Sequence, residues 1–462
     1  MYDLKSPGVY RYEEERFLPQ EAELETGVPA FLGCYPIIIP KDTLPIALKS
    51  WDEFEEKFPE FIALRNWAEF QVALQEYLQE FDEEEKQAIL KYVAEEKEYI
   101  EISLKNSFLP YSVSGFFENG GSVCYVISID SRYFEKLSES DKKKIEIDSE
   151  KERGAFQKGI DLAASLDDMD IVCAPDIMKN REERNSTKYE QAAILQAKVL
   201  EHCEHHGDRF AILDSIYKAR VIDIQNQRAG ILEHSTMLRA TYGALYFPWI
   251  GVQESVNQSS TAEYVKYIPP CGHIAGVYAR SDKQIGVHKA PANEILEGVL
   301  DLDCENLPNA NLTNAEQDIL NPSHINCIRA FPGRGIRIWG ARTIADDSSW
   351  RYINVRRLFL TISRWIDRNM RNVTFEIYDT KLWSLIEKQL IIYFNDLFKR
   401  GALKGNTAKE AFYVKCDKET NPPEIRDTGM VIVEIGLAPT VPNEFVVIRI
   451  IRSASGFTIT EA

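Results

Sequence analysis

Three histidines close to residue 205 are the side chains of this sequence best suited to bind a metal ion. His202 and His206 stand four residues apart, so both lie on one face of a helix predicted over Thr187–His206. A structural interpretation competes, because the exposed carbonyls and the negative dipole end of a last helical turn also favour histidine. No second group of ligands is evident in the sequence. We therefore favour the structural interpretation and expect neither a metal nor another cofactor.

Glycines in residues 333–340 form the segment closest to a phosphate-binding loop. The segment reads Gly-Arg-Gly-Ile-Arg-Ile-Trp-Gly, and a dinucleotide fingerprint would need a strand before it and a helix after it. Ile336 and Ile338 instead alternate with Arg337 and Trp339, which is typical of a strand. We therefore predict a turn between two strands here. The sequence contains no GxxxxGKS, GxSxG or HExxH pattern.

Arginine is concentrated late in the chain. Residues 329–372 contain ten arginines, three aspartates and neither lysine nor glutamate, a local charge of 10 minus 3, or +7. Because Arg suits bidentate pairing with carboxylates, we interpret this enrichment as a pairing surface. Part of it lies on a helix predicted over Val355–Met370, apart from the apolar stripe of that helix. The partner would be another copy of the chain, whose N-terminal half is acidic, or a second acidic protein.

The overall composition limits the classes of partner. The chain has 462 residues and a formal charge of 54 minus 72, or −18, with a pI near 5.0. A length of this kind suggests roughly two to four packing units. The hydrophobic fraction of 44% is ample for sizeable cores and excludes disorder of the whole chain. The excess of carboxylates repels phosphate backbones and anionic membranes, so binding to either would need a local basic patch.

The cysteines and the N-terminal residues indicate in which cellular compartment the protein resides. Eight cysteines are scattered singly without a Cys-x-x-Cys pair, which argues against a zinc ribbon, a redox dithiol or a disulfide framework. We expect free thiols in a reducing compartment. The first residues lack the regions of a signal peptide, and no apolar stretch approaches the ~18 residues of a membrane span. These features predict a protein that stays in the cytoplasm.

Strands and helices alternate in the middle of the chain. In chain order we predict a strand at 122–129, a helix at 155–166, a strand at 169–174, a helix at 187–206, and strands at 209–214 and 242–249. Short apolar strands separated by helices form βαβ units, hence a parallel sheet with helices on both faces. Apolar strands at 27–33 and 37–39 indicate that the packed domain begins near Thr26.

The remaining segments differ from this series. Residues 51–101 carry 16 acids and 5 bases, a net charge of −11, with apolar residues at helical spacing, so we expect an acidic helical insertion on the surface. Gly8–Tyr12 is a short β-like stretch followed by a run of glutamates that cannot build a core. Near the end, a second amphipathic helix at 381–400 precedes strands. These are predicted at 411–416, 430–437 and 444–452.

An ordered set of motifs resembles a known family, the contractile tail sheath proteins of phages and of related bacterial contractile injection systems. The motifs are SPGVY (6–10), GVPAFLG (27–33), AGVYARSD (275–282), HKAPAN (288–293), INCIRAFPGRGIRIWGARTI (325–344), WRYINVRRL (350–358), FEIYD (375–379), GALKG (401–405), AFYVKCD (411–417) and APTVPNEFVVIRI (438–450). The resemblance is dense from about Tyr242 onward, present at the N-terminus, and weak across the helical insertion.

The resemblance implies an α/β fold, α+β overall, whose central domain has a subtilisin-like parallel sheet. The implied parts are an N-terminal arm with an exchange strand (1–25), the N-terminal strands of the core (26–50), the acidic helical insertion (51–110), the subtilisin-like sheath domain (111–330), the C-terminal α/β sheath core domain (331–440) and a C-terminal strand arm (441–462). The two arms are expected to be extended strands.

A subtilisin-like fold raises the question of hydrolase activity. The segment PCGHIAG (270–276) is similar to the serine-bearing helix of those proteases, GTSMxxPHVAG. Counting back from His273 places the nucleophile at Ile268, which has no attacking atom. Cys271 is near, one turn into the expected helix, but no base is identifiable. We therefore expect no enzymatic activity.

The resemblance also implies a function. Sheath subunits of the family polymerise as stacked hexameric rings around an inner tube and contract to drive the tube through a target envelope. Neighbours are linked by exchanged terminal strands, for which the matching residues here are Val9, Tyr10, Arg11, Phe445, Val446, Val447, Ile448 and Ile450. Our candidates for electrostatic contacts between subunits or with the tube are Arg356, Arg357, Arg364, Arg368, Lys399, Arg400 and Lys404.

The implied partners are other copies of the chain, an inner tube protein, a baseplate, terminator or cap proteins and a disassembly ATPase, without nucleic acid or direct membrane insertion. The implied location is the bacterial cytoplasm as an assembled contractile particle, or a virion tail. Two alternatives stay open. One is a catalytically dead relative of subtilisin-like hydrolases with a different scaffold role. The other is an arginine-rich nucleic-acid-binding protein, which the charge of the whole chain opposes.

Overall fold

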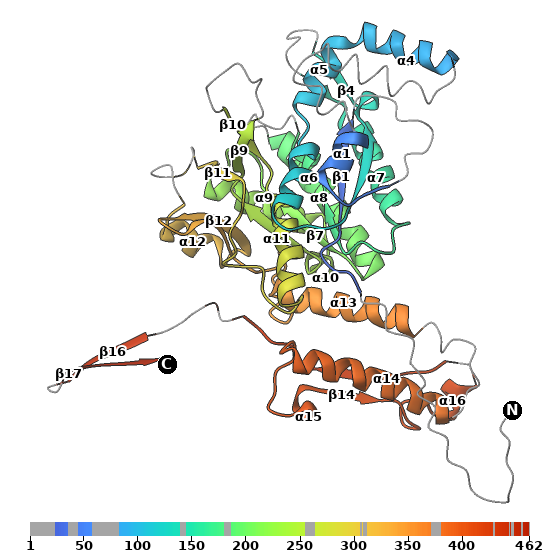
Figure 1. Ribbon diagram of the computed structural model, residues 1–462, viewed down its shortest axis with the longest axis vertical. Helices are drawn as coiled ribbons and strands as arrows, with labels where there is room; N and C mark the ends of the chain where they lie inside the picture. The colour runs from blue at the N-terminus through green and yellow to red at the C-terminus, as the bar shows by residue number, and fades with distance from the viewer. Residues whose placement is uncertain are drawn as a thin grey trace, which may run out of the picture.

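A mixed sheet of eight strands forms the centre of the protein in the computed structural model (Figure 1). The structure describes residues 24–35, 45–57, 83–138, 145–179, 186–254, 264–304, 307, 312–370, 380–427, 430–442, 444, 448–453 and 456–461. Across the sheet the strands are β13 (Gly335–Trp339), β12 (Ile325–Phe331), β8 (Gly243–Phe247), β7 (Phe210–Asp214), β6 (Ile171–Cys173), β1 (Pro29–Tyr35), β3 (Cys124–Asp130) and β2 (Ile46–Leu48). The six strands from β12 to β3 run parallel, and an antiparallel strand closes each edge.

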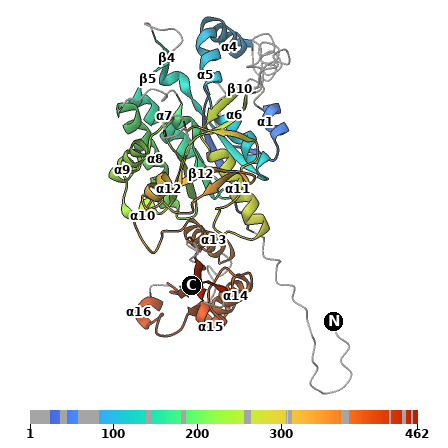
Figure 2. The same ribbon diagram turned by 90° about the vertical axis from the view of Figure 1, so that its left-hand side faces the viewer.

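Helices cover both faces of this sheet, as the alternating sequence predicts. Figure 2 shows α7 (Ser149–Ala163), α8 (Ser186–His206) and α9 (Val221–Glu233) on one side, with α6 (Leu109–Glu118) and α11 (Cys271–Gln284) on the other. The residues of β6, β7 and β8 are all buried, because helices exclude water from both faces. The α/β class predicted from the sequence is confirmed.

Glycines allow α6 and α11 to pack with their backbones close together. A Cβ atom at Gly272 would overlap the carbonyl oxygen of Ser112, and one at Gly276 would overlap that of Phe116. On the other helix, a Cβ at Gly115 would overlap the imidazole of His273. The glycine-rich sequence at the start of α11 is therefore a helix-packing motif.

The predicted insertion is helical, but part of it belongs to the core. Its described helices are α1 (Trp51–Lys57), α4 (Glu83–Glu95) and α5 (Lys97–Lys105), and residues 58–82 lie outside the described part. Helix α4 forms the outer end of the molecule in Figure 1. Helix α5, in contrast, buries Tyr99, Ile100 and Leu104 in the main core, and α1 buries Phe54. The expectation of an entirely superficial insertion is corrected accordingly.

Smaller elements complete the central domain. They are β4 (Glu135–Leu137), β5 (Ile145–Ile147), β9 (Ile250–Glu254), β10 (Tyr264–Ile268), β11 (Val299–Leu302), α10 (Met237–Ala240), α12 (Asn314–Leu320) and two 3-10 turns, Ser131–Tyr133 and Pro175–Met178. Strands β10, β9 and β11 form a separate antiparallel sheet. All eight cysteines are buried and none forms a disulfide, as predicted. None of the helices in the described ranges combines the length and apolar character needed to cross a bilayer.

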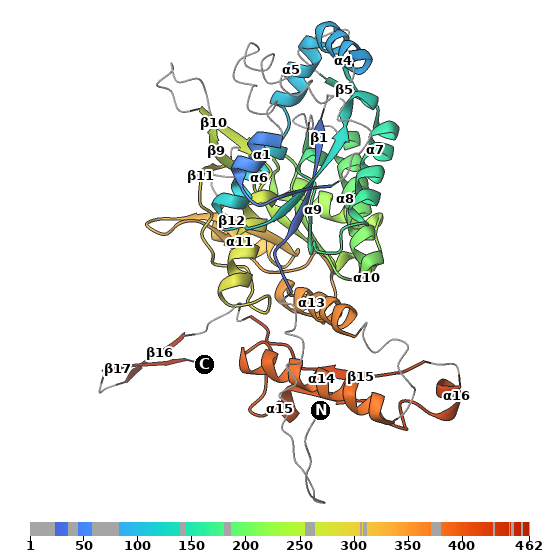
Figure 3. The same cartoon turned by 45° about the vertical axis from the view of Figure 1, so that its right-hand side comes forward.

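Helix α13 (Ile353–Asn369) joins the central domain to the C-terminal domain and belongs to both cores (Figure 3). Its Ile353 and Leu360 pack in the central core, whereas Leu358, Ile362 and Trp365 pack in the second core. The second core is completed by α14 (Thr380–Lys399), α15 (Ala408–Ala411), β14 (Phe412–Lys415), α16 (Pro423–Arg426) and β15 (Glu434–Leu437). Strands β14 and β15 pair antiparallel.

The structure changes two details of the predicted chain order. The boundary predicted at residue 331 falls inside the hairpin of β12 and β13, so the central sheet extends further along the chain than expected. At the end of the chain, β16 (Ile448–Ser453) pairs antiparallel with β17 (Gly456–Glu461), a strand absent from the prediction. This hairpin stands apart from both domains in Figure 1.

Candidate functional site

The carboxyl edge of the parallel sheet is where an α/β protein would bind a ligand, at the point where the strand order reverses. Here that point lies between β1 and β6, and Asp176 occupies it. Its carboxylate accepts the backbone N–H of Cys34 at 2.7 Å and that of Phe108 at 2.6 Å. Nearby, Lys179 pairs with Glu135 at 3.0 Å, and each side chain is 1% exposed. The chain's own charged groups therefore fill this crevice.

The protease-like segment forms a packed helix start. Ile268 ends β10 and is fully buried, and Cys271 is the first residue of α11, earlier than predicted. The backbone N–H of Cys271 donates to Asp214 at 2.9 Å, and burial raises the pKa of the Cys271 thiol. Burial lowers the pKa of His273 to about 4, so its imidazole is neutral near pH 7. Because the position of the nucleophile holds Ile268, these residues lack the groups of a catalytic triad.

At the end of α8, His202 contacts a charged side chain of the same chain. The Nε2 atom of His202 lies 3.2 Å from the guanidinium of Arg209, and burial together with this cation lowers the pKa of His202 to about 3. A neighbouring cation opposes the binding of another positive charge at the same site. Within the described ranges, no three His, Cys, Asp or Glu side chains are arranged to hold a metal ion.

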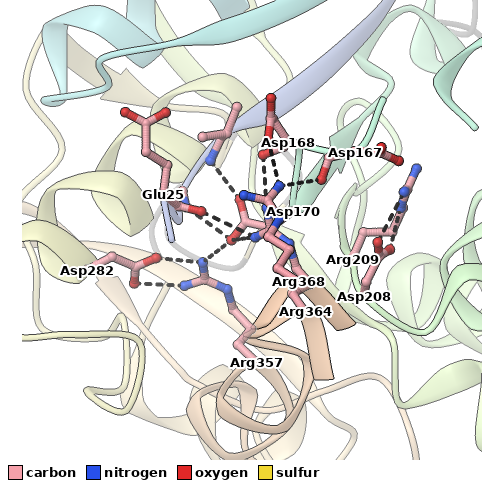
Figure 4. A network of polar contacts seen from close by, with 12 residues as sticks. Glu25, Asp167, Asp168, Asp170, Asp208, Arg209, Asp282, Arg357, Arg364 and Arg368 are labelled. Carbon is pink, nitrogen blue, oxygen red and sulfur yellow. Dashed lines mark hydrogen bonds and ion pairs between the residues drawn. The ribbon is translucent and has the colours of Figure 1, made fainter. Parts of the chain in front are cut away.

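The arginines of α13 form a cluster of polar contacts with residues of the central domain, shown in Figure 4. Arg357 makes a bidentate pair with Asp282 of α11, at 2.9 and 2.7 Å, and donates to Asp170 at 3.1 Å. The side chains of Arg357 and Asp282 are 3% and 2% exposed. Burial opposes the charge of Arg357, but the two carboxylates outweigh it and raise the pKa of the guanidinium. This is the planar pairing for which Arg is suited.

Arg364 and Arg368 continue the cluster along α13. Arg364 donates to the carbonyl oxygens of Glu25 at 3.3 Å and of Asp168 at 2.9 Å. Arg368, which is one third exposed, pairs with the carboxylate of Asp168 at 2.6 Å. These contacts connect α13 to the segments that lead into β1 and β6.

Arg356 lies on another side of α13, between aromatic rings. Its guanidinium carbon is 3.8 Å from the ring centre of Tyr242 and 4.5 Å from that of Trp350, which is cation–π geometry. In the folded chain Arg356, Arg357 and Arg364 are buried among residues of the same chain. This corrects the expectation that the three lie on a surface for contacts with other molecules. The prediction of bidentate carboxylate pairing applies to Arg357, inside the subunit.

The basic residues at the end of α14 lie on the surface. Lys399, Arg400 and Lys404 are all exposed, around a turn at Gly401 whose φ of +79° favours glycine. Arg400, just past the end of α14, pairs with Asp396 of that helix at 2.8 Å, and both groups are about half exposed or more. Such a pair contributes little to stability and can be exchanged for another partner. These three residues stay candidates for contacts with another molecule.

The predicted exchange strands lie at the ends of the chain. Val9, Tyr10 and Arg11, like Phe445, Val446 and Val447, lie outside the described residues. Ile448 and Ile450 belong to β16, where they pair with Glu461 and Ile459 of β17. Sequence reasoning missed β17, although Gly456–Glu461 alternates apolar and polar residues after a Ser-Ala-Ser-Gly turn signal.

Sequence reasoning also missed the acids that surround α13. Asp170 and Asp282 lie 112 residues apart in the chain (282 minus 170), and each stands beside other charged residues that do not mark it out, Asp167 and Asp168 for the first and Arg280 and Lys283 for the second. Asp170 interrupts the apolar run Met169–Ala174, which is the one local signal that it has a specific partner. Its partners could be found only from the packing of α13 on the sheet.

Comparisons with known proteins bear on this arrangement. Two family models match adjoining parts of the chain, the phage tail sheath protein central domain over residues 161–344 and the phage tail sheath C-terminal domain over residues 345–451. Together they cover more than half of the chain. The boundary between them falls in the segment that leads from β13 to α13.

Solved structures share the fold over nearly the whole chain. The helical sheath of the anti-feeding prophage in the contracted state has 24% identity and a TM-score of 0.62, covering 97% of this chain and 100% of that one. The sheath complex of the extracellular contractile injection system PVC, also contracted, has 22% identity and a TM-score of 0.60, covering 98% and 99%. At these identities the likeness shows a common fold.

Curated relatives agree with the family models. The tail sheath protein of Salmonella phage ViI is 23% identical over 61% of this chain and 43% of its own length. A putative prophage major tail sheath protein of Pseudomonas aeruginosa strain UCBPP-PA14 is 24% identical over 40% of this chain and 46% of its own length. The chain thus spans less than half the length of the curated relatives it matches. From the two adjoining family matches, the chain belongs to the phage tail sheath protein family.

Proposed function

We propose that this chain is a structural subunit of a contractile sheath, which polymerises as stacked hexameric rings around an inner tube and contracts to drive the tube through a target envelope. The observation that carries the proposal is the uninterrupted match to both sheath domains over residues 161–451. The likeness of the whole fold to helical sheaths supports it. Self-assembly is the first expected partnership, and a baseplate is the second, since a chain of the anti-feeding prophage baseplate has the same fold.

The ends of the chain fit a subunit that is completed by its neighbours. The β16–β17 hairpin stands apart from both domains, and no other strand among the described residues pairs with it, so further strands could be added at its edges. A strand added to such an edge gains main-chain hydrogen bonds that tolerate rotation of the domain behind it. Head-to-tail contacts of this kind propagate into tubes instead of closing on a pair. We infer that Val9–Arg11 and Phe445–Ile450 take part in this exchange.

Contraction in this proposal needs neither catalysis nor a cofactor. An extended lattice held by the inner tube and the baseplate would be kinetically trapped, and its relaxation would release free energy stored during assembly. The buried charges at the carboxyl edge of the central sheet and the buried Ile268 favour this structural role over hydrolysis. Terminator or cap proteins and a disassembly ATPase would act on the assembled particle, in the bacterial cytoplasm or as a virion tail.

Lys399, Arg400 and Lys404 are our candidates for contact with the inner tube. They are exposed and lie beside a tight turn at the end of α14, on a protein with an overall charge of −18. Replacing all three with Glu should reduce sheath assembly on purified tubes at least about tenfold, because each charge reversal turns attraction into repulsion. Co-sedimentation with tubes measures this, and the matched Lys283→Glu variant at the end of α11 should bind as the native chain does. Unchanged assembly of the triple variant would refute this assignment.

Two other functions can be separated from this one by direct assays. A scaffold derived from a hydrolase but unrelated to sheaths would leave the chain monomeric and unreactive toward a fluorophosphonate probe. A nucleic-acid-binding function would give a salt-dependent mobility shift with DNA. Neither is favoured, because the arginines of α13 are engaged within the subunit and the chain is acidic as a whole.

The proposed function is tested by removing the arms. We expect the full chain to form assemblies that sediment at high speed, whereas a chain lacking residues 1–23 and one lacking residues 445–462 remain small. Both variants should keep the unfolding temperature of the full chain, since neither deletion removes a residue that the structure describes as part of the two cores. Sedimentation of the truncated chains as well as the full chain would contradict strand exchange.

A further inference from the structure

The N-terminal arm enters the folded part of the chain at the arginine cluster of α13. Asp170 accepts the backbone N–H of Gly27 at 3.0 Å and of Val28 at 2.7 Å, while Arg357 holds the same carboxylate at 3.1 Å (Figure 4). Further along the same helix, Arg364 donates to the carbonyl oxygen of Glu25. The root of this arm, Glu25–Val28, is therefore held through its backbone N–H groups and through a carbonyl oxygen. The groups that hold it belong to α13 or are positioned by it.

The C-terminal arm leaves the folded part of the chain at the first turn of the same helix, about one turn from Arg357. Asn354, in the first turn of α13, donates to the carbonyl oxygen of Thr440 at 3.1 Å and to that of His288 at 2.8 Å. Arg342, which precedes α13, pairs through its Nε atom with Glu444 at 2.8 Å. The side chain of Arg342 is 9% exposed and that of Glu444 is 14% exposed, so this pair is also shielded from water.

The steric fit around the first root is as specific as its charges. Gly27 has a φ of +74°, and a Cβ atom there would overlap the backbone of Ala279 in α11. Leu24, just before the root, packs against the core of the C-terminal domain. Both domains thus contact the arm within the four residues 24–27. The buried charge pairs of α13 lie at the same place and connect the two domains there. Breaking a pair of this kind leaves an unpaired buried charge, which is strongly destabilising locally.

We propose that α13 is a common anchor for the two arms, which fixes their roots so that the exchangeable parts of the chain end at Leu24 and at Glu444. In a lattice whose subunits are joined through the arms, tension on either arm would reach the same helix, and the helix is packed in both cores. The subunit would then move as one body, and bending would be confined to the residues beyond the two roots. The inference rests on the proposed function in one respect, that the arms are swapped between neighbouring subunits.

Hydrogen–deuterium exchange on the isolated full-length subunit tests the anchor. In Arg357→Gln we expect the amides of Gly27 and Val28 to exchange at least about tenfold faster than in the native chain, because Asp170 loses its nearer cation at 3.1 Å and keeps only Arg364 at 3.9 Å. Asp282→Asn, which keeps an acceptor beside Arg357, should give a smaller change in the same direction. Arg368→Gln, a more exposed position on the same helix, is the matched control and should leave both amides unchanged.

Peptides from β7 and β8 serve as the folding standard in each variant. If they stay protected while Gly27 and Val28 exchange faster, the cluster anchors the arm. If Gly27 and Val28 stay as protected in Arg357→Gln and Asp282→Asn as in the native chain, the anchor is refuted. Should Arg357→Gln unfold as a whole, Asp282→Asn alone decides between these outcomes.

Hydrogen–deuterium exchange on assembled particles tests where the part of the arm that is swapped between subunits ends. We expect residues before Leu24 to gain protection on assembly and the amides of Gly27 and Val28 to keep the protection they have in the isolated subunit. A change at those two amides would place the boundary elsewhere and contradict the proposal. Failure of the chain to assemble at all would instead contradict the proposed function, while the isolated-subunit experiment would still decide the anchor.

Discussion

Asp214 lies at the carboxyl end of β7, beside the first turn of α11, and is one of the most deeply buried carboxyl groups of the chain. It accepts the backbone N–H of Cys271, and burial raises its pKa from 3.8 to about 7. Between these two pH values the folded chain keeps a proton that the unfolded chain has released. The contribution of Asp214 therefore makes the free energy of unfolding fall as pH rises from about 4 to 7, with no further change above that range.

Asp214→Asn should remove this dependence. The variant should gain stability relative to the native chain by about 1.4 kcal/mol per pH unit, or about 4 kcal/mol between pH 4 and 7. Urea unfolding of both proteins at several pH values gives the difference, in which the other titrating groups cancel. A difference that stays constant with pH would show that Asp214 is already ionised in the folded chain.

Gly272 tests the close approach of α6 and α11. Because a Cβ atom would overlap the carbonyl oxygen of Ser112, Gly272→Ala should lower the free energy of unfolding by about 1–3 kcal/mol. Gly154 in α7 is the matched control, since nothing lies within 4 Å of the position that its Cβ atom would take. Gly154→Ala should raise stability by about 0.5–1 kcal/mol through its helix propensity. Equal effects of the two substitutions in urea titrations would contradict this packing.

For individual residues, the sequence predicted the kind of interaction that a side chain makes better than the place in the fold where it makes it. The arginine enrichment correctly indicated bidentate carboxylate pairing, but Arg357 makes this pair inside the subunit. A charged residue in an amphipathic helix is ordinarily assigned to the solvent, because a single sequence gives no information on distant partners. Ile268 was correctly judged unable to act as a nucleophile, since that conclusion depends only on the atoms of its side chain.

At the scale of elements, α5 shows how one face of a charged helix, with two lysines and two glutamates, is held on an apolar core. Lys179 and Glu135 pair beneath it, and Ser103 of α5 donates to Glu135 at 2.8 Å. Lys179→Met should cost about 3–5 kcal/mol, because it leaves the carboxylate of Glu135 buried without its cation. The double variant Lys179→Met, Glu135→Met should be more stable than the single one. Urea unfolding measures both, and a double variant less stable than the single would contradict this explanation.

The central strands and helices were predictable because the apolar pattern of each segment matches its burial in the folded chain. Strands β6, β7 and β8 read as apolar runs and are buried on both faces. Helix α5 was misassigned because it was counted within the acidic segment 51–101, although its own two Lys and two Glu balance; its burial depends on the one face that carries Tyr99, Ile100 and Leu104. Strand β17 was missed although its alternating residues follow a turn signal.

For the whole molecule, the formal charge of −18 hides an uneven distribution. The acidic segment at 51–101 and the arginine-rich segment at 329–372 have opposite charges, and arginines of the second pair with Asp170, Asp282 and Asp168. The surface of the subunit is therefore less basic near α13 than the sequence suggests. Basic candidates for contact with another molecule remain at the end of α14.

The architecture places both arm roots on α13, between two cores that share this helix. A subunit built in this way can be linked to its neighbours through its ends without a rearrangement of either domain. The sequence indicated the arms and the central sheet, but the role of α13 as their meeting point depends on contacts between residues far apart in the chain, such as Glu25 and Arg364.

Electron microscopy of the purified full-length chain tests the central claim, polymerisation into a sheath, most directly. Negatively stained samples, with or without tubes of the partner protein, should contain hollow cylinders of uniform width with a regular axial repeat. Small monodisperse particles under both conditions, from a chain shown to be folded by its cooperative unfolding, would contradict the assignment of this protein as a sheath subunit.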